Sequence, residues 1–90
     1  MKRYVIEREI PGIGNSNAAQ LRDAATKSCV ALAKMATEVQ WIESYVTPDK
    51  TFCVYLAKDV AAVRKHAAAS GFPADVITEV KSMLDATMAA

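Results

Sequence analysis

Residues 39–57 constrain the fold more than any other part of the sequence, because two runs of β-favouring side chains flank a short turn. Residues 39–46 and 51–57 are rich in Val, Ile, Tyr, Trp and Phe. The intervening TPDK carries the proline and aspartate that favour tight turns. The pattern predicts an antiparallel hairpin, and the rest of the chain must fold around it.

The segment before the hairpin predicts a strand and a helix. Residues 3–10 alternate, with one better-buried side made of Tyr4, Ile6, Arg8 and Ile10. After PGIGNS, Asn17 and Gln20 have the spacing of a capping box, which begins a helix. The residues expected on the inner side of that helix recur at helical spacing: Leu21, Ala25, Ser28, Leu32 and Met35.

The segment after the hairpin predicts a second helix and a last strand. Asp59 is a suitable N-cap, Val60, Val63 and Ala67 face inward, and Gly71 ends the helix before Pro73. For the following residues the pattern also fits a helix, and we favour a turn over 74–77 and a strand over 79–84.

The order βαββαβ predicts an α+β fold of the ferredoxin-like kind, in which two helices cover one face of a four-stranded antiparallel sheet. A chain of 90 residues leaves room for one domain, so we expect a single domain over 1–90 with a loose C-terminal tail over 84–90.

Composition narrows the classes of function. The net charge is +1, and no basic cluster is interleaved with aromatic residues, so nucleic acid is not an expected partner. No stretch approaches the roughly 18 apolar residues of a membrane span, and the N-terminal apolar run is too short for a signal peptide. We therefore expect a cytoplasmic protein without a membrane partner. Cys29 and Cys53 match neither a CxxC motif nor a disulfide framework, which predicts reduced, structural thiols.

The hairpin also predicts which side chains the helices leave uncovered. The plainly aliphatic positions suit the helix side: Ile42, Ser44, Val46, Phe52, Val54 and Leu56. The mixed set is then expected on the uncovered face: Glu7, Trp41, Glu43, Tyr45, Cys53 and Tyr55. Because such an aromatic face is too apolar to remain bare, we expect a homodimer in which two sheets enclose a barrel with a ligand cavity.

Three segments resemble a known family in their order and spacing: YVIEREIPGIG, WIESYVTPDKTFCVYLA and HAAASGFPAD. The family consists of small bacterial domains of unknown function that form ferredoxin-like dimers, some of them labelled nickel-binding, and the resemblance runs from about Tyr4 to Val80. It implies a dimeric α+β barrel with a metal or small-molecule site. The sequence departs from the family at Lys65, where an acidic residue is common before the histidine, and in its DATMAA ending.

His66, Glu7 and Glu43 are the candidate metal ligands. His66 is the only histidine, and its combination with carboxylates suits nickel, zinc or copper. Alternatively, His66 is a hydrogen-bonded structural residue, and the two glutamates form ion pairs with Arg3, Arg8 or Lys50.

Trp41, Tyr45, Tyr55 and Lys50 are the candidate residues for binding an organic ligand, with Lys50 at the rim of the barrel, where it attracts an anion. The alternatives are that the aromatic residues belong to the core or to an interface, and that Lys50 is a solvated turn residue.

From these residues we predict a non-catalytic binding protein that holds a nickel-type metal ion or a small organic ligand in the barrel. Two other classes stay open. One is a cofactor-free enzyme that uses His66 or a glutamate as acid or base, and the other is a purely structural interaction module.

Overall fold

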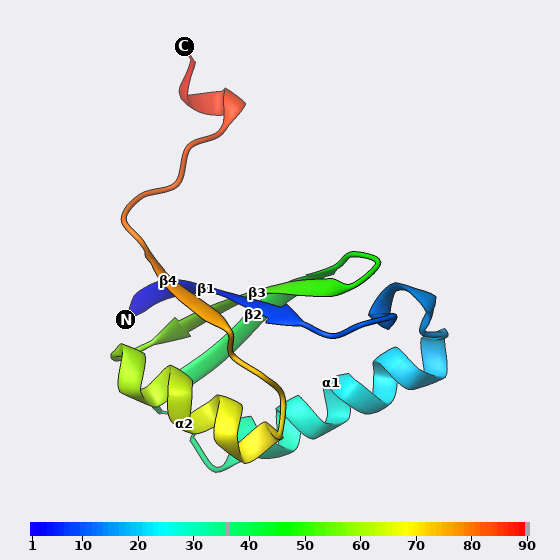
Figure 1. Ribbon diagram of the computed structural model, residues 1–90. Helices are drawn as coiled ribbons and strands as arrows, with labels where there is room; N and C mark the ends of the chain where they lie inside the picture. Colours follow the sequence, from blue (N-terminus) through cyan, green and yellow to red (C-terminus); the bar gives the residue numbers. More distant parts are fainter. Residues whose placement is uncertain (36, 90) are drawn as a thin grey trace.

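A four-stranded antiparallel sheet is covered on one face by two helices (Figure 1). This computed structural model describes residues 1–35 and 37–89. The elements are β1 (Lys2–Glu9), η1 (Ile13–Asn15), α1 (Ala18–Ala33), β2 (Val39–Val46), β3 (Lys50–Ala57), α2 (Val60–Ser70), β4 (Val76–Val80) and η2 (Ala86–Met88). The strands lie in the order β2-β3-β1-β4, which confirms the predicted ferredoxin-like fold.

Both helices begin at the predicted caps. Asn17 Oδ1 accepts a hydrogen bond from the Gln20 amide at 2.8 Å, and Gln20 Oε1 accepts one from the Asn17 amide at 2.9 Å, which completes the capping box. Asp59 Oδ1 accepts from the Ala62 amide at 2.8 Å at the start of α2. Gly71 ends α2 in the left-handed region, with φ of 76°. In the described part of the chain, neither helix has the length and apolar character needed to cross a membrane.

The predicted hairpin forms, and the loop after β1 supports its turn. The Thr47 amide donates to the Lys50 carbonyl at 2.9 Å, which closes the turn. The Gly14 amide donates to the Pro48 carbonyl at 2.9 Å, so that η1 lies against the turn. A Cβ atom on Gly14 would be only 2.6 Å from Pro48 Cα, and this close approach therefore requires glycine.

The last strand lies earlier in the chain than we expected. We predicted a turn over 74–77 and a strand over 79–84, but β4 spans Val76–Val80 and pairs with β1. Its register places Ile77 opposite the fully buried Ile6, so tertiary packing fixes its position. From Lys81 to Ala89 the side chains are exposed, and the segment runs away from the sheet on the side opposite the helices (Figure 1).

The hydrophobic core lies between the helices and the sheet. Its buried members come from both strands and helices: Tyr4, Ile6, Met35, Val39, Cys53, Tyr55, Ala57, Ala62 and Val63. Burying an aliphatic side chain such as Ile6 or Val63 contributes about 1.5–3 kcal/mol to stability. Small residues such as Ala57 and Ala62 within this core let the backbones of β3 and α2 approach each other.

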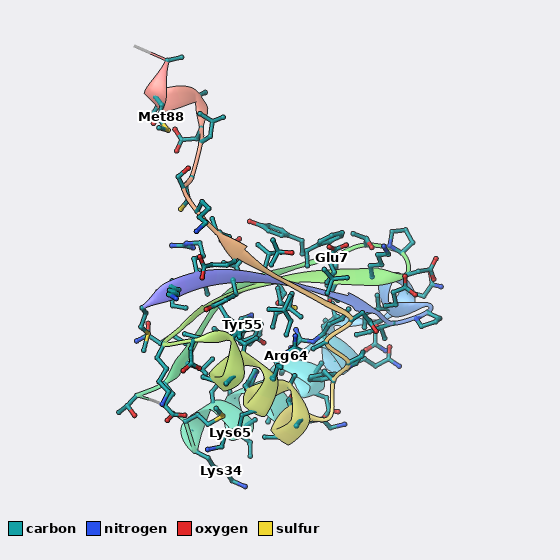
Figure 2. All side chains as sticks on the ribbon, turned by 60° about the vertical axis from the view of Figure 1, so that its left-hand side comes forward. Glu7, Lys34, Tyr55, Arg64, Lys65 and Met88 are labelled. Atoms are coloured by element: carbon teal, nitrogen blue, oxygen red, sulfur yellow. The ribbon has the colours of Figure 1, made fainter. Side chains whose placement is uncertain are left out.

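The face predicted for β3 is wrong. Thr51, Cys53, Tyr55 and Ala57 are buried toward the helices, whereas the more hydrophobic set of β3 lies on the other face: Phe52, Val54 and Leu56. Figure 2 shows Tyr55 on the helix side of the sheet and Glu7 on the opposite side. The physical reason is that the space beneath the helices suits small side chains and a tyrosine whose hydroxyl finds polar partners there.

The two sides of β2 are rearranged by an irregularity in its pairing with β3. Trp41 pairs with Tyr55 and Glu43 pairs with Val54, so Ile42 is an extra residue between them. The bulge turns Trp41 toward the helices while Glu43 and Tyr45 face away from them. Trp41 therefore does not share a face with Glu43 and Tyr45, contrary to the strict alternation that we assumed.

We call the uncovered side of the sheet the open face. Its members follow from the pairing of the four strands: Arg3, Val5, Glu7, Gln40, Glu43, Tyr45, Phe52, Val54, Leu56, Val76, Thr78 and Val80. Aliphatic and aromatic residues predominate in its centre, and Tyr45 is 55% exposed. The centre of the open face is therefore apolar, and of the mixed set predicted for this face only Glu7, Glu43 and Tyr45 lie there.

Candidate ligand-binding site

A cavity of about 220 Å³ lies between α1 and the helix side of the sheet. It is near the end of the molecule at which η1, the first turns of α1 and the hairpin turn meet (Figure 1). Its lining comes from the strands, α1 and two loops: Arg8, Ile10, Ile13, Leu21, Ala24, Ala25, Ser28, Trp41, Ser44, Val46, Thr51, Cys53 and Phe72. A concave, mostly apolar site with a few polar groups is typical of small-molecule binding.

Arg8 supplies the charged group of this cavity. The alternation of β1 places it on the covered face, opposite Thr51, and only 2% of its surface is exposed. Its guanidinium carbon lies 5.7 Å from the ring centroid of Tyr55, which gives a cation–π contact. Within residues 1–35 and 37–89, neither Nε nor Nη2 has a hydrogen-bond partner. A buried charge in this condition is unusual, because such groups are normally paired.

Ser28, Tyr55 and His66 form a buried polar cluster beside the cavity. His66 Nε2 lies 3.2 Å from the Tyr55 hydroxyl, and the Ser28 hydroxyl lies 3.4 Å from each of these atoms. The His66 and Tyr55 rings are tilted by 52° with centroids 5.0 Å apart. The cluster joins α1, β3 and α2, and Ser28 also lines the cavity, so the cluster holds one wall in place.

Burial determines the protonation states in this cluster. Burial first, and the nearby Arg8 charge second, lower the pKa of His66 below its ordinary value, so the imidazole is neutral near pH 7. Burial raises the pKa of the Tyr55 hydroxyl, although Ser28 and Arg8 act in the opposite direction. His66 and Tyr55 therefore bring no negative charge to the Arg8 guanidinium.

The remaining walls are apolar side chains and hydroxyl groups. Trp41 presents its indole to the cavity, and its Nε1 donates to the Ser44 hydroxyl at 3.0 Å, which fixes the ring. Thr51 and Cys53, which also line the cavity, lie 3.6 Å apart at their Oγ1 and Sγ atoms. Chemically, the arrangement can hold an anion at Arg8 and a compact apolar group against Trp41 and α1.

The predicted metal ligands do not come together within the chain. His66 is fully buried beneath the sheet, whereas Glu7 and Glu43 are on the open face. Glu7 and Glu43 belong to β1 and β2, which are separated by β3. In the portion of the chain that the structure describes, no group of three or more His, Cys, Asp or Glu side chains is placed to hold a metal ion. The described residues of the single chain therefore do not fit a nickel site.

The predicted organic-ligand residues are divided between the two faces. Trp41 lines the cavity, and Tyr55 lies beside it under Arg8. Tyr45 is on the open face, where the neighbouring Glu43 carboxylate raises the pKa of its phenol. Lys50 begins β3, and its Nζ lies 3.9 Å from Glu9 Oε1, which makes it a partner of an exposed ion pair.

Sequence reasoning missed Arg8 and Ser28 as site residues. Both had a usable signal. Arg8 continues the buried side of its strand after Tyr4 and Ile6, and Ser28 interrupts the apolar stripe of its helix. A charged or polar residue in a buried period is either paired or functional, and the structure shows no pairing for Arg8 Nε and Nη2 among the described residues.

The sheet order and the two helices on one face define a small ferredoxin-like α+β domain, with a cavity between α1 and the sheet. Residues 4–80 match the family described as nickel responsive protein SCO4226-like, and the chain belongs to this family. The crystal structure of SCO4226 from Streptomyces coelicolor A3(2) is similar, with a TM-score of 0.76 and 18% sequence identity over 91% of this chain and 99% of that chain. No match was found among curated proteins.

Proposed function

We propose that this chain is a non-catalytic binding protein that takes a small organic ligand in the cavity between α1 and the sheet. The observation that carries the proposal is the buried Arg8 guanidinium, which belongs to a mostly apolar cavity lining and has two donors without protein partners among the described residues. A ligand that meets these donors removes the cost of burying them unpaired. The proposed ligand therefore lies on the helix side of the sheet rather than inside a dimeric barrel.

The test of the ligand site fills the cavity without altering its charge. Ala25 is half-buried on α1 and lines the cavity, whereas Ala33 is exposed on the same helix. We would screen wild type, Ala25→Leu and Ala33→Leu by ligand-observed NMR against small fragments of mixed charge. Fragments that bind wild type and Ala33→Leu but not Ala25→Leu would support the site. A screen in which no fragment shows this dependence would reject it.

The proposal includes a homodimer that forms through the open face. Val54 and Leu56 occupy its centre and are only half-buried in the single chain, and Tyr45 is exposed beside them. A contiguous apolar surface of this kind marks an interaction site, and a two-fold contact lets one surface cover its own copy. The small size of the chain also supports the dimer, because a single small chain buries only a modest share of its surface on folding.

Light scattering tests the dimer directly. Wild type is expected at twice the chain mass of 9.7 kDa at micromolar concentration. Val54→Asp introduces a charge in the open face and should give monomers, whereas Ala68→Asp on the exposed side of α2 should not. A wild-type protein that is monomeric under these conditions would contradict the proposed association.

Nickel is a second candidate ligand, because the family description names a response to nickel. Since one subunit does not gather the ligands, the site requires two. In a dimer joined at the open faces, Glu7 and Glu43 of both subunits lie at one interface, and carboxylates from two chains are available there.

Calorimetry on tag-free protein at pH above 7 separates the possible nickel ligands. Glu7→Gln or Glu43→Gln should weaken nickel binding, whereas His66→Ala should leave it unchanged while the dimer persists. Loss of nickel binding in His66→Ala alone would instead identify the imidazole as the ligand and contradict the interface site.

A further inference from the structure

The geometry points to a carboxylate with a compact apolar body as the ligand of the Arg8 cavity. This inference rests on the proposed function, because it names the chemical class that the cavity takes. We infer that the carboxylate accepts two parallel hydrogen bonds from Arg8 while its apolar part lies against Trp41 and the first turns of α1.

The pair of free donors determines the shape of the anion. Nε and Nη2 lie on one edge of the guanidinium, which is the edge that matches the two oxygens of a carboxylate. Both atoms are fully buried in the ligand-free protein, so the guanidinium turns this edge toward the cavity when the ligand binds. These are the two guanidinium atoms that are buried without a partner in residues 1–35 and 37–89. A neutral ligand with one acceptor would leave one of them unpaired.

Charge balance requires that the ligand be negative. A guanidinium stays charged under all conditions in which proteins fold. No Asp or Glu is among the residues that line the cavity, and no ion pair of Arg8 is present in the chain as described. His66 is neutral, because burial and the Arg8 charge lower its pKa. The positive charge is therefore uncompensated until an anion enters.

The rest of the lining favours an organic anion over an inorganic one. Around Arg8, the other polar side chains are hydroxyls and a thiol, those of Ser28, Ser44, Thr51 and Cys53. The remaining walls are aliphatic or aromatic, and an apolar group of the ligand would remove them from contact with water, which is favourable. A volume of about 220 Å³ is below the usual range for drug-sized ligands, so the body of the ligand is compact.

Benzoate and its neutral isostere benzamide are the probes that we would use. Amide NMR spectra of wild type, Arg8→Met, Arg8→Lys and Arg64→Met would be recorded during titration with each compound and with inorganic phosphate. Arg64 is an exposed arginine on α2 and serves as the matched control. Arg8→Lys keeps the charge but loses the parallel pair of donors.

We expect benzoate to shift the amides of cavity residues in wild type and in Arg64→Met. Benzamide should bind wild type at least about tenfold more weakly than benzoate, because its amide cannot satisfy a charged pair of donors. Arg8→Met should lose benzoate binding by about tenfold or more, and Arg8→Lys should be intermediate.

Three results would overturn the inference. Equal binding of benzamide and benzoate at the cavity would reject the carboxylate class but leave the proposed binding function standing. Binding of inorganic phosphate alone would show that the site takes a free anion without an apolar body. Absence of binding by both benzoate and benzamide, together with a fragment screen that shows no dependence on Ala25→Leu, would reject both proposals.

Discussion

Replacing Arg8 by methionine should stabilise the ligand-free protein, although most substitutions of buried residues destabilise. Methionine keeps an unbranched side chain in the cavity but removes the charge. Each of the two unpaired N–H groups costs about 1–3 kcal/mol while it remains buried. The cation–π contact with Tyr55, which the variant loses, contributes about 0.5–2 kcal/mol. Together these ranges give an increase of about 0–5.5 kcal/mol in the free energy of unfolding, with a midpoint of about 3 kcal/mol.

The assay is urea unfolding monitored by the fluorescence of Trp41, the single tryptophan, which lines the same cavity. The protein would first be unfolded and refolded to remove bound ligand, and all variants would be compared at one subunit concentration, since ligands and association shift apparent stability. In thermal unfolding the same change should raise Tm by roughly 4–8 °C per kcal/mol. Arg64→Met, at an exposed position, should change stability by less than about 0.5 kcal/mol.

A destabilised Arg8→Met variant would refute this reasoning. It would show that the guanidinium has favourable partners in the ligand-free protein, so that its burial needs no ligand. An increase in stability accompanied by loss of benzoate binding would mean that the chain retains a destabilising residue for its function.

Three further predictions test the fold around the site. Gly14→Ala should lower the free energy of unfolding by about 1–3 kcal/mol in urea, because its Cβ would press on the Pro48 backbone; an unchanged midpoint would show that η1 moves freely away from the turn. Asp59→Ala should cost about 1 kcal/mol in thermal unfolding through loss of the α2 N-cap, and Asp59→Asn should restore most of it. Because the folded-state pKa of His66 is lowered, the unfolded chain binds a proton more readily, so the free energy of unfolding should fall as the pH drops below the ordinary pKa of 6.5. His66→Gln should show a shallower fall. Parallel profiles of stability against pH for the two proteins would contradict the neutral imidazole.

The parts of the fold that local chemistry specifies were predictable from the sequence. Asn17 with Gln20, Asp59 with Gly71, and the TPDK turn each act over a few residues, and each occurs where expected. The position of β4 was not predictable in this way, because its bounds depend on pairing with β1, which is distant in the sequence.

The site was predicted only in part, for two physical reasons. Hydrophobicity alone favoured Phe52, Val54 and Leu56 as the covered set, but the space beneath the helices takes three small side chains of β3 and Tyr55, whose hydroxyl has polar partners there. The irregularity at Ile42 then reverses the side on which Trp41 lies, and no local sequence signal marks it. Trp41 therefore lines a cavity on the helix side of the sheet and not the uncovered face on which we expected it.

The bulge at Ile42 also affects how sequences of related proteins should be compared with this one. In a strand, a side chain's face depends on whether its position is odd or even, so an alignment gap of one residue within β2 exchanges the inward and outward sets over the rest of the strand. A relative with the same number of residues in β2 but without the bulge would place the counterpart of Trp41 beside those of Glu43 and Tyr45, outside the cavity. Where the strand lengths are equal, residue roles can therefore be transferred across this hairpin only if the bulge itself is shared.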